Sequence, residues 1–380
     1  REFVDELLSD PSTARVALQY DTTIGLASLR RTLLDHLAAL DGVSVEQLGY
    51  SANEILITNG SQQGLYLAAE SLFDPGDIVL CEAPSYFVYT TALQGFGVRC
   101  VGVPMDEQGM RIDMLEETLL ALRDRGELSR VKAIYTVDYY QNPTGLTLSA
   151  ERRVAMLELA RRFSESHRIL ILEDAAYREL YYDASDLPPA SIKSMDDDNA
   201  FVAYFGTFSK PFAPGLKLGY AVLPHALLEP MLNLKGNHDF GTGNLSQHVA
   251  QRALVGGAYL AHLDTLRAGY RRKCGLMLQA LERHMPQDVS WTIPQGGLYT
   301  WLTLACGDTA RTGPIFAEAM RRGVLYVPGD YCFVPSLGGA MPTNQLRLCF
   351  ATVPDERIEP GVQRLADAVR AITDQTDGRR

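Results

Sequence analysis

The 380-residue sequence has no long apolar run and no apolar segment at its start that would mark a secretion signal. A membrane-spanning helix needs about 20 consecutive apolar residues, and no stretch of the sequence approaches that length. We therefore expect a soluble protein of the cytoplasm with no membrane partner.

Cysteines are few, and basic residues are outnumbered. The six cysteines are scattered, without a CxxC pair and without a neighbouring histidine, which predicts reduced thiols, no disulfide framework and no metal site. The 35 basic residues against 46 acidic ones leave a net charge of −11. This balance argues against a large nucleic-acid-binding face, because such a face needs excess positive charge.

What is present is typical of a globular enzyme. Hydrophobic residues make up 46% and charged residues 21%, which excludes a disordered chain. No internal repeat stands out, so solenoids and propellers are set aside. The length predicts two or three domains.

Short runs rich in β-branched residues alternate with amphipathic stretches from about Asn53 onward. The runs predict seven buried strands, at 54–58, 78–80, 98–103, 131–137, 169–172, 201–205 and 218–223. Helices are expected between them at 62–72, 86–93, 114–123 and 150–163, with Ser149 as the N-cap of the last. This order predicts an α/β fold with a mostly parallel seven-stranded sheet and helices on both faces.

The pattern changes after about Gly256. A long helix at 258–284 precedes shorter elements, expected at 289–293, 298–304 and 314–322, with further strands at Val324 and Leu346. This end reads as a smaller α+β domain. We predict an N-terminal segment at 1–40 that contributes to the small domain or an interface, a large domain at 41–256 and the small domain at 257–380. A helix at 26–40 could belong to either domain or bridge them.

Polar segments follow several predicted strands at their carboxyl ends, where ligands bind in open α/β sheets. The segments are Asn59-Gly-Ser-Gln-Gln-Gly64, Asp138-Tyr-Tyr-Gln-Asn-Pro-Thr-Gly145, Glu173-Asp-Ala-Ala-Tyr177 and Gly206-Thr-Phe-Ser-Lys-Pro211. The first could bind a phosphate at a helix N-terminus, or be a simple cap made by Asn59 or Ser61. The second could equally be a turn.

Taken together and in this order, these segments resemble the aspartate-aminotransferase-like class I/II aminotransferases, which are fold-type-I enzymes dependent on pyridoxal 5′-phosphate. The similarity runs from about Tyr20 to Phe350. Two segments, 59–64 and 141–145, most resemble the 2-aminoadipate/kynurenine aminotransferase branch. The resemblance makes 41–256 the cofactor-binding domain.

The resemblance implies that Lys210, Asp174 and Tyr177 carry the catalysis. Lys210 would form the Schiff base with the cofactor aldehyde and move the substrate proton, which requires a lowered pKa. Asp174 would keep the pyridinium nitrogen protonated, and Tyr177 would bond to the ring oxygen. On their own, Lys210 could be a surface salt-bridge partner and Asp174 a helix cap.

Further cofactor contacts are implied for residues of the other segments. Asn142 would bond to the same ring oxygen as Tyr177, and Tyr86 would stack on the ring, although a core tyrosine is the plain alternative. The phosphate would be bound by residues with free amides, hydroxyls or a positive charge, namely Ser61, Gln62, Thr207, Ser209 and Lys217.

The substrate and a second subunit complete the implied site. Arg347 would bind the substrate α-carboxylate, because a guanidinium fork matches a carboxylate, and Asn142 is implied as a second substrate contact. Without the resemblance Arg347 would be an exposed salt-bridge partner. The pair Gly296-Gly297 would let backbone approach closely. Tyr20 would reach the phosphate of a neighbouring subunit, which implies a homodimer with shared active sites.

Three features depart from the family pattern or lie outside it. Lys217 stands where an arginine is usual, and Asp138 where proline is common. Asp138 could alter acid–base chemistry at the substrate, or simply face solvent. The segment 236–244, with His238 and Asp239, could line the entrance or only connect two helices.

The leading hypothesis is transfer of an amino group between an α-amino acid and a 2-oxo acid, as part of amino-acid metabolism or biosynthesis. The same scaffold supports β-elimination or decarboxylating deamination, since the outcome depends on which Cα bond is perpendicular to the ring. An effector-binding regulatory domain is a third hypothesis. The acidic charge and the lack of a helix-turn-helix pattern argue against it.

Overall fold

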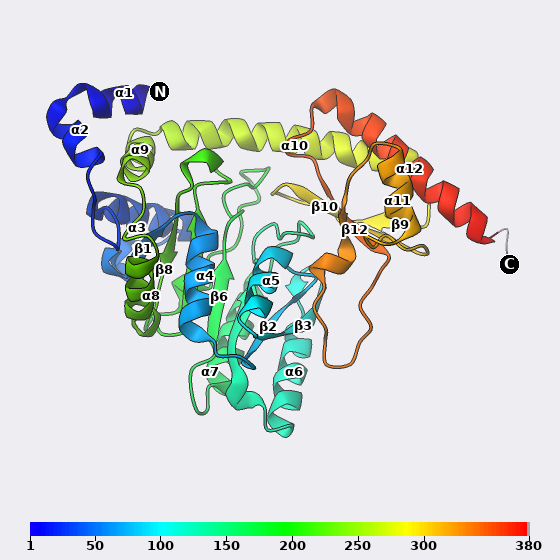
Figure 1. Ribbon diagram of the computed structural model, residues 1–380, viewed down its shortest axis with the longest axis horizontal. Coiled ribbons are helices and arrows are strands. Elements are labelled where there is room, and N and C mark those ends of the chain that lie inside the picture. The colour runs from blue at the N-terminus through cyan, green and yellow to red at the C-terminus, as the bar shows by residue number, and fades with distance from the viewer. Residues whose placement is uncertain (378–380) are drawn as a thin grey trace.

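Eight strands form the larger sheet of the computed structural model, which describes residues 1–377 (Figure 1). From edge to edge they are β1 (Ile55–Thr58), β8 (Gly219–Val222), β7 (Val202–Thr207), β6 (Leu170–Asp174), β5 (Val131–Thr136), β2 (Ile78–Ala83), β3 (Arg99–Asp106) and β4 (Gly109–Met110). Strands β7, β6, β5, β2 and β3 are parallel, whereas β8 is antiparallel to both its neighbours. The mostly parallel α/β sheet is confirmed, and the two-residue β4 is a strand beyond the seven predicted.

The sheet is buried on both faces because alternate side chains enter two different cores. Along β2, Ile78 and Leu80 pack into one core, and Val79 and Cys81 into the other. The first core is covered by α6 (Ile112–Asp124) and α7 (Ala150–Phe163). The continuous apolar runs in the sequence have this cause, since a strand covered on both faces cannot alternate with polar residues.

The opposite face is covered mainly by helices α3 (Ala27–Asp41), α4 (Ser61–Leu72), α5 (Phe87–Gly95), α8 (His225–His238) and α9 (Asn244–Val255). The predicted helix boundaries hold within two residues, and Ser149 caps α7 by accepting a hydrogen bond from the Arg152 amide. Two short helices, α1 (Glu2–Ser9) and α2 (Pro11–Ala17), pack against α9 at the N-terminal end.

A smaller antiparallel sheet follows the 27-residue helix α10 (Ala258–His284), which spans both parts of the molecule in Figure 1. Its strands are β11 (Val327–Pro328), β12 (Gln345–Cys349), β10 (Tyr299–Leu304) and β9 (Val289–Trp291), packed with α11 (Pro314–Arg321) and α12 (Asp355–Asp377). This confirms the α+β character of the C-terminal part. The strand predicted at Val324 is wrong, because the Val324 amide bonds to Ala319 at the end of α11 and the strand starts later.

One edge of the large sheet collects the chain segments that matter for function. The carboxyl ends of β1, β2, β5, β6 and β7 meet there, and the antiparallel β8 starts there, opposite Thr58 and Thr207. All the polar segments singled out in the sequence leave the sheet at this edge. Within residues 1–377 we find no helix long and apolar enough to cross a membrane.

Candidate active site

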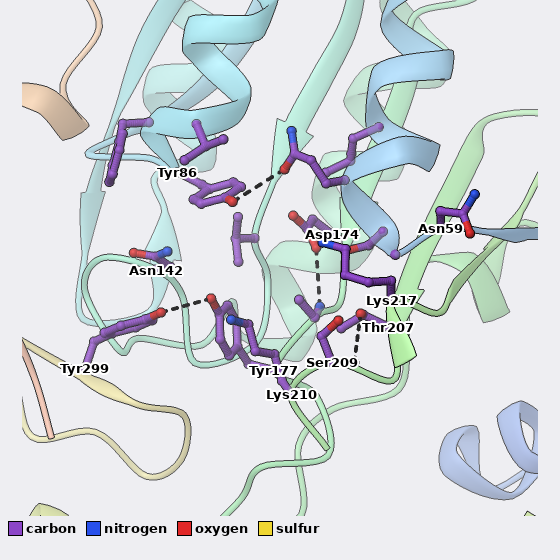
Figure 2. A pocket seen from close by; sticks show the side chains of 18 of the residues that line it. Asn59, Tyr86, Asn142, Asp174, Tyr177, Thr207, Ser209, Lys210, Lys217 and Tyr299 are labelled. Carbon is purple, nitrogen blue, oxygen red and sulfur yellow. Dashed lines mark hydrogen bonds between the residues drawn. The ribbon is translucent and has the colours of Figure 1, made fainter. Parts of the chain in front are cut away.

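A cavity of about 350 Å³ opens at this edge, between the large sheet and the small one. It is lined by eleven of the twelve predicted site residues: Ser61, Gln62, Tyr86, Asn142, Asp174, Tyr177, Thr207, Ser209, Lys210, Lys217 and Arg347. The twelfth, Tyr20, lies outside it with 81% of its surface exposed. In the view of Figure 2, Tyr86, Asn142 and Tyr299 lie on one side and Lys217, Thr207 and Ser209 on the other.

Asp174, the last residue of β6, lines the cavity and is almost fully buried. Its Oδ2 accepts a hydrogen bond from the Tyr135 hydroxyl at 3.0 Å, and its Oδ1 one from the Ala176 amide at 3.3 Å. Burial raises the pKa of this carboxyl to about 6, although these hydrogen bonds and Lys210 pull in the other direction. The buried carboxylate is therefore poised to pair with a cation brought into the cavity.

Lys210 follows β7 and extends into the same cavity (Figure 2). Its amine lies 5.9 Å from the ring centre of Tyr177, and no described residue accepts a hydrogen bond from it. Burial lowers the pKa of this amine and Arg347 adds to the shift, while Cys349 and Asp174 oppose it. An unpaired amine with a lowered pKa is the form that can act as a nucleophile or base.

Arg347 and Asn142 meet across the boundary between the two sheets. The Nη1 of Arg347, on β12, donates to the Asn142 Oδ1 at 2.6 Å, and the guanidinium lies 4.3 Å from the Tyr299 ring centre. The Nε of Arg347 is buried and has no acceptor within residues 1–377. The arginine therefore lines the cavity with one donor unused by the described residues, and it is not the exposed ion-pair partner considered from the sequence.

The opposite end of the cavity offers donors without a side-chain cap. Helix α4 begins after Gly60, whose φ is +78°, and no side chain caps its first amides. The alternative that Asn59 or Ser61 caps this helix is therefore wrong. Lys217, in the left-handed conformation at φ +51°, lines the same end. Free amides at a helix N-terminus beside an ammonium form an anion site.

Close backbone approach shapes this end. A Cβ on Gly219, the first residue of β8, would lie 2.5 Å from the Ser61 amide nitrogen and 2.6 Å from the Gly60 carbonyl carbon. Only glycine lets β8 run this close to the start of α4. The Ser209 amide donates to the Thr207 hydroxyl at 3.1 Å, which orders the neighbouring turn.

Next to Asn59 lies a partly buried polar cluster. The Asn59 amide group donates to Asp239 at 2.7 Å, and Gln63 and Lys235 bond to the same carboxylate. Of the segment 236–244, the first residues end α8 and the rest connect it to α9. The segment is thus a helix–helix connection, and its Asp239 holds the Asn59 loop from behind.

Asp138 corrects the sequence analysis. Its side chain neither lines the cavity nor faces solvent, but is fully buried in an ion pair with Arg153 of α7. The Glu173 carboxylate lies 3.6 Å from the same Nη1 atom of Arg153. Neither proposed role for Asp138, at the substrate or at the surface, is correct.

The pair Gly296-Gly297 provides the expected close approach, although to another part of the site. A Cβ on either glycine would come within 2.8 Å of the Tyr140 side chain, and Gly297 has a φ of +74°. The glycines therefore let the small sheet pack on the Tyr140 turn, which precedes Asn142.

Sequence reasoning missed the roles of Tyr299, Val137 and Phe87 in the lining. The Tyr299 hydroxyl lies 3.3 Å from that of Tyr177 and so links the two sheets across the cavity. The signal for Tyr299 was its position two residues after the glycine pair, at the start of a strand. No comparable signal marked Phe87, which looks like any apolar residue in a helix.

Comparison with known proteins places this arrangement among known aminotransferases. The family model for aminotransferase class I and II matches residues 8–365. An aromatic-amino-acid aminotransferase 1 of Thermococcus litoralis is 35% identical over 94% of this chain and 81% of its own length. A 2-aminoadipate transaminase of Thermus thermophilus is 35% identical over 94% and 83%. The crystal structure of the Pyrococcus horikoshii kynurenine aminotransferase, described as a complex with PMP, is 35% identical, with a TM-score of 0.88 over 97% of this chain and 87% of that one.

Proposed function

The chain belongs to the class I and II aminotransferases, and from that premise we propose that its cavity binds pyridoxal 5′-phosphate and uses Lys210 as the catalytic amine. The observation that carries the proposal is one cavity containing an unpaired lysine amine, a buried carboxylate and an arginine with a free donor. These three groups match the aldehyde, the ring nitrogen and the substrate carboxylate.

The residues present fit the cofactor. At one end the uncapped amides of α4 and the Lys217 ammonium suit a phosphate. Gly219 lets β8 approach the Gly60–Ser61 backbone at this end. Tyr86 covers one side of the cavity, and its hydroxyl donates to Gln62 Oε1 at 3.4 Å. The volume of about 350 Å³ lies within the range of small-ligand sites.

When bound, pyridoxal 5′-phosphate supplies an aldehyde that takes up the amino group and a ring that withdraws electrons from the substrate Cα. Asp174 stabilises a proton on the ring nitrogen, which requires its carboxylate form beside a cation. Lys210 Nζ removes the proton from Cα and later returns one, and its lowered pKa makes the neutral amine accessible. Tyr177 holds the ring oxygen through its hydroxyl, whose other neighbour is Tyr299.

Arg347 orients the substrate. With the α-carboxylate bound to the guanidinium, the bond from Cα to the carboxylate would be restrained and the Cα–H bond would be the one presented to Lys210. This orientation favours proton removal over decarboxylation. Asp138, which was considered for altered acid–base chemistry at the substrate, gives elimination no support, because it is buried against Arg153.

We also infer that the amino donor has an apolar or aromatic side chain. Three cations line the cavity within the described chain, and Lys210, Lys217 and Arg347 are all committed to roles above. None remains for a second carboxylate, whereas Leu65, Phe87 and Val88 add apolar surface. The Thermococcus litoralis relative is named for aromatic amino acids, which supports this substrate class.

A homodimer with shared sites completes the proposal. Tyr20 is exposed and packs edge-on against Phe240, which is itself 60% exposed, with ring centres 5.4 Å apart. Two exposed aromatic rings side by side are typical of a surface that a second subunit covers. The free cysteines support the cytoplasm as the compartment.

The test is to follow the cofactor spectrum of the purified protein. We expect phenylalanine to convert the cofactor to its aminated form and 2-oxo acids to convert it back. 2-Aminoadipate should react with a kcat/KM at least about tenfold lower, because a second carboxylate would be buried without a partner. A cofactor that never reaches the aminated form with any donor would contradict the assignment of the cavity, and a preference for 2-aminoadipate would contradict only the substrate class.

A further inference from the structure

The loop 138–148 connects β5 to α7 and carries Asn142, the partner of Arg347. It is internally ordered, since the Gln141 amide donates to the Leu146 carbonyl at 2.8 Å and the Tyr140 amide to the Thr147 hydroxyl at 3.1 Å. Tyr140 adopts a φ of +44°, a left-handed conformation that is unfavourable for a tyrosine. Contacts outside the loop must therefore stabilise its shape.

One guanidinium closes the base of this loop. Arg153 donates from Nη2 to the Asp138 carbonyl at 2.7 Å and from Nε to the Leu148 carbonyl at 3.0 Å, and its Nη1 pairs with the Asp138 carboxylate. Arg153 thus holds the first and the last part of the loop together. Its guanidinium also stacks on the Tyr139 ring at 4.1 Å from the ring centre.

The closure is buried, which makes it strong and costly to disturb. Arg153, Asp138 and Glu173 are each about 1% exposed or less. Burial raises the pKa of both Asp138 and Glu173, and the Arg153 guanidinium opposes the shift in each. Removing one partner of such a pair leaves a buried charge without compensation.

The tip of the loop contacts the small sheet at the substrate clamp. Besides the bond between Asn142 and Arg347, the Thr144 carbonyl accepts a hydrogen bond from the Thr292 hydroxyl at 2.7 Å. A Cβ on Gly145 would lie 2.8 Å from the Tyr299 carbonyl oxygen, so the loop packs directly on β10. A displacement of the loop where Arg153 holds its two ends would therefore also displace Asn142.

We propose that Arg153, paired with Asp138, is a positioning residue that sets the orientation of the Arg347 carboxylate clamp through Asn142. The inference rests on the proposed role of Arg347. Because Arg153 lies on α7 outside the cavity, it acts on carboxylate affinity through the loop and not by touching substrate.

The test measures binding of 3-phenylpropanoate, the deaminated analogue of phenylalanine, to the holoenzyme by spectral titration. Arg153→Lys keeps the charge, but one ammonium cannot reach three acceptors in the fork geometry. We expect the Kd of the analogue and the KM for phenylalanine to rise about tenfold, with kcat changed less than about threefold, since misplacement by about 1 Å can cost on the order of 10²-fold.

Arg152→Lys is the matched control. Arg152 is the preceding residue of the same helix and forms an equally elaborate contact, with both Asp106 oxygens and the carbonyls of Gly109 and Met110, none of which belongs to the loop 138–148. We expect it to lower thermal stability without changing the Kd. If Arg153→Lys raises the Kd of the analogue no more than Arg152→Lys does, the proposal is wrong.

A double-mutant cycle with Asn142→Ala tests the route. If Arg153 acts through Asn142, the two effects on the Kd should be strongly less than additive, and full additivity would contradict the proposal. Should Arg153→Lys fail to fold, Asp138→Asn takes its place in the cycle with the same expectation. Arg347→Ala tests the proposed role of Arg347 separately from that of Arg153. An unchanged Kd of the analogue in this variant would show that Arg347 does not bind the carboxylate.

Discussion

At the residue scale, burial moves the pKa values of an acid, Asp174, and a base, Lys210, toward each other. It raises the pKa of Asp174 to about 6 and lowers that of Lys210, and each acts on the other in the reverse direction. A carboxyl kept in an apolar site is costly to the folded chain but valuable as a counter-ion for a cationic ring. This conflict between stability and function leads to the first prediction.

Asp174→Asn should abolish most activity and stabilise the cofactor-free protein. The pKa of about 6 in the folded state exceeds the ordinary 3.8, so ionisation of this carboxyl destabilises the folded chain. The free energy of unfolding therefore falls as pH rises from about 4 to about 6, by up to about 3 kcal/mol. Urea unfolding of the apo forms should show the variant's advantage growing by on the order of 1 kcal/mol between pH 5 and 7.5. We expect kcat to fall by about 10²-fold or more. A near-normal kcat would show that Asp174 is only structural.

Lys210 should carry the cofactor covalently. Borohydride reduction followed by peptide mapping is expected to find the pyridoxyl label on Lys210, whose amine is unpaired within the described chain. Lys210→Ala should still bind the cofactor non-covalently and lose turnover, because the proton carrier is missing. The second lysine of the cavity, Lys217, is the internal control, and a label found there would reverse the two assignments.

At the scale of elements, the site depends on strand ends meeting helix starts. The predicted strands follow from the periodicity of apolar residues. Helices α7 and α10 have the predicted bounds, and Ser149 caps the first of them as expected. The contact between β8 and α4 does not follow from periodicity, since it depends on the antiparallel insertion of β8 between β1 and β7. The strand predicted at Val324 was misplaced for a similar reason. Periodicity did not show that residues 324–326 are a loop and that β11 starts only after them.

Gly219→Ala should weaken cofactor binding by about tenfold or more, because the added methyl would press on Gly60 and Ser61 and displace the uncapped amides. The measurement is a spectral titration of the apoprotein with pyridoxal 5′-phosphate. Gly215→Ala is the control, since nothing lies within 4 Å of its Cβ position in the preceding turn. Equal affinity of the two variants would mean that this approach does not shape the phosphate end.

At the scale of the whole molecule, the cavity combines segments from both sheets, and Tyr20 lies outside it on the same chain. If Tyr20 serves the site of a second subunit, every site takes Lys210 from one chain and Tyr20 from the other. The exposed pair Tyr20 and Phe240 is then an interface.

Mixing two impaired variants tests this sharing. In reassembled dimers of Tyr20→Phe and Lys210→Ala, half should be mixed and each of these should contain one intact site, which restores up to about a quarter of the wild-type activity. Recovery would be absent if Tyr20 acted within its own chain. Light scattering that finds an active monomer would also contradict the shared site.

The sequence by itself determined the α/β fold and the order of the polar segments, and its resemblance to the aminotransferases implied eleven of the residues that line the cavity. The strand pattern was enough to bring the polar segments together, because parallel strands end at one edge of a sheet and segments that follow different strands meet there. Only the tertiary structure decided what Asp138 and Tyr299 do. Asp138 is set by Arg153 on the next helix, and Tyr299 by its contact with Tyr177 across the cavity. These pairings depend on which face each side chain takes after the two sheets have packed, and the local pattern of a sequence contains no record of that choice.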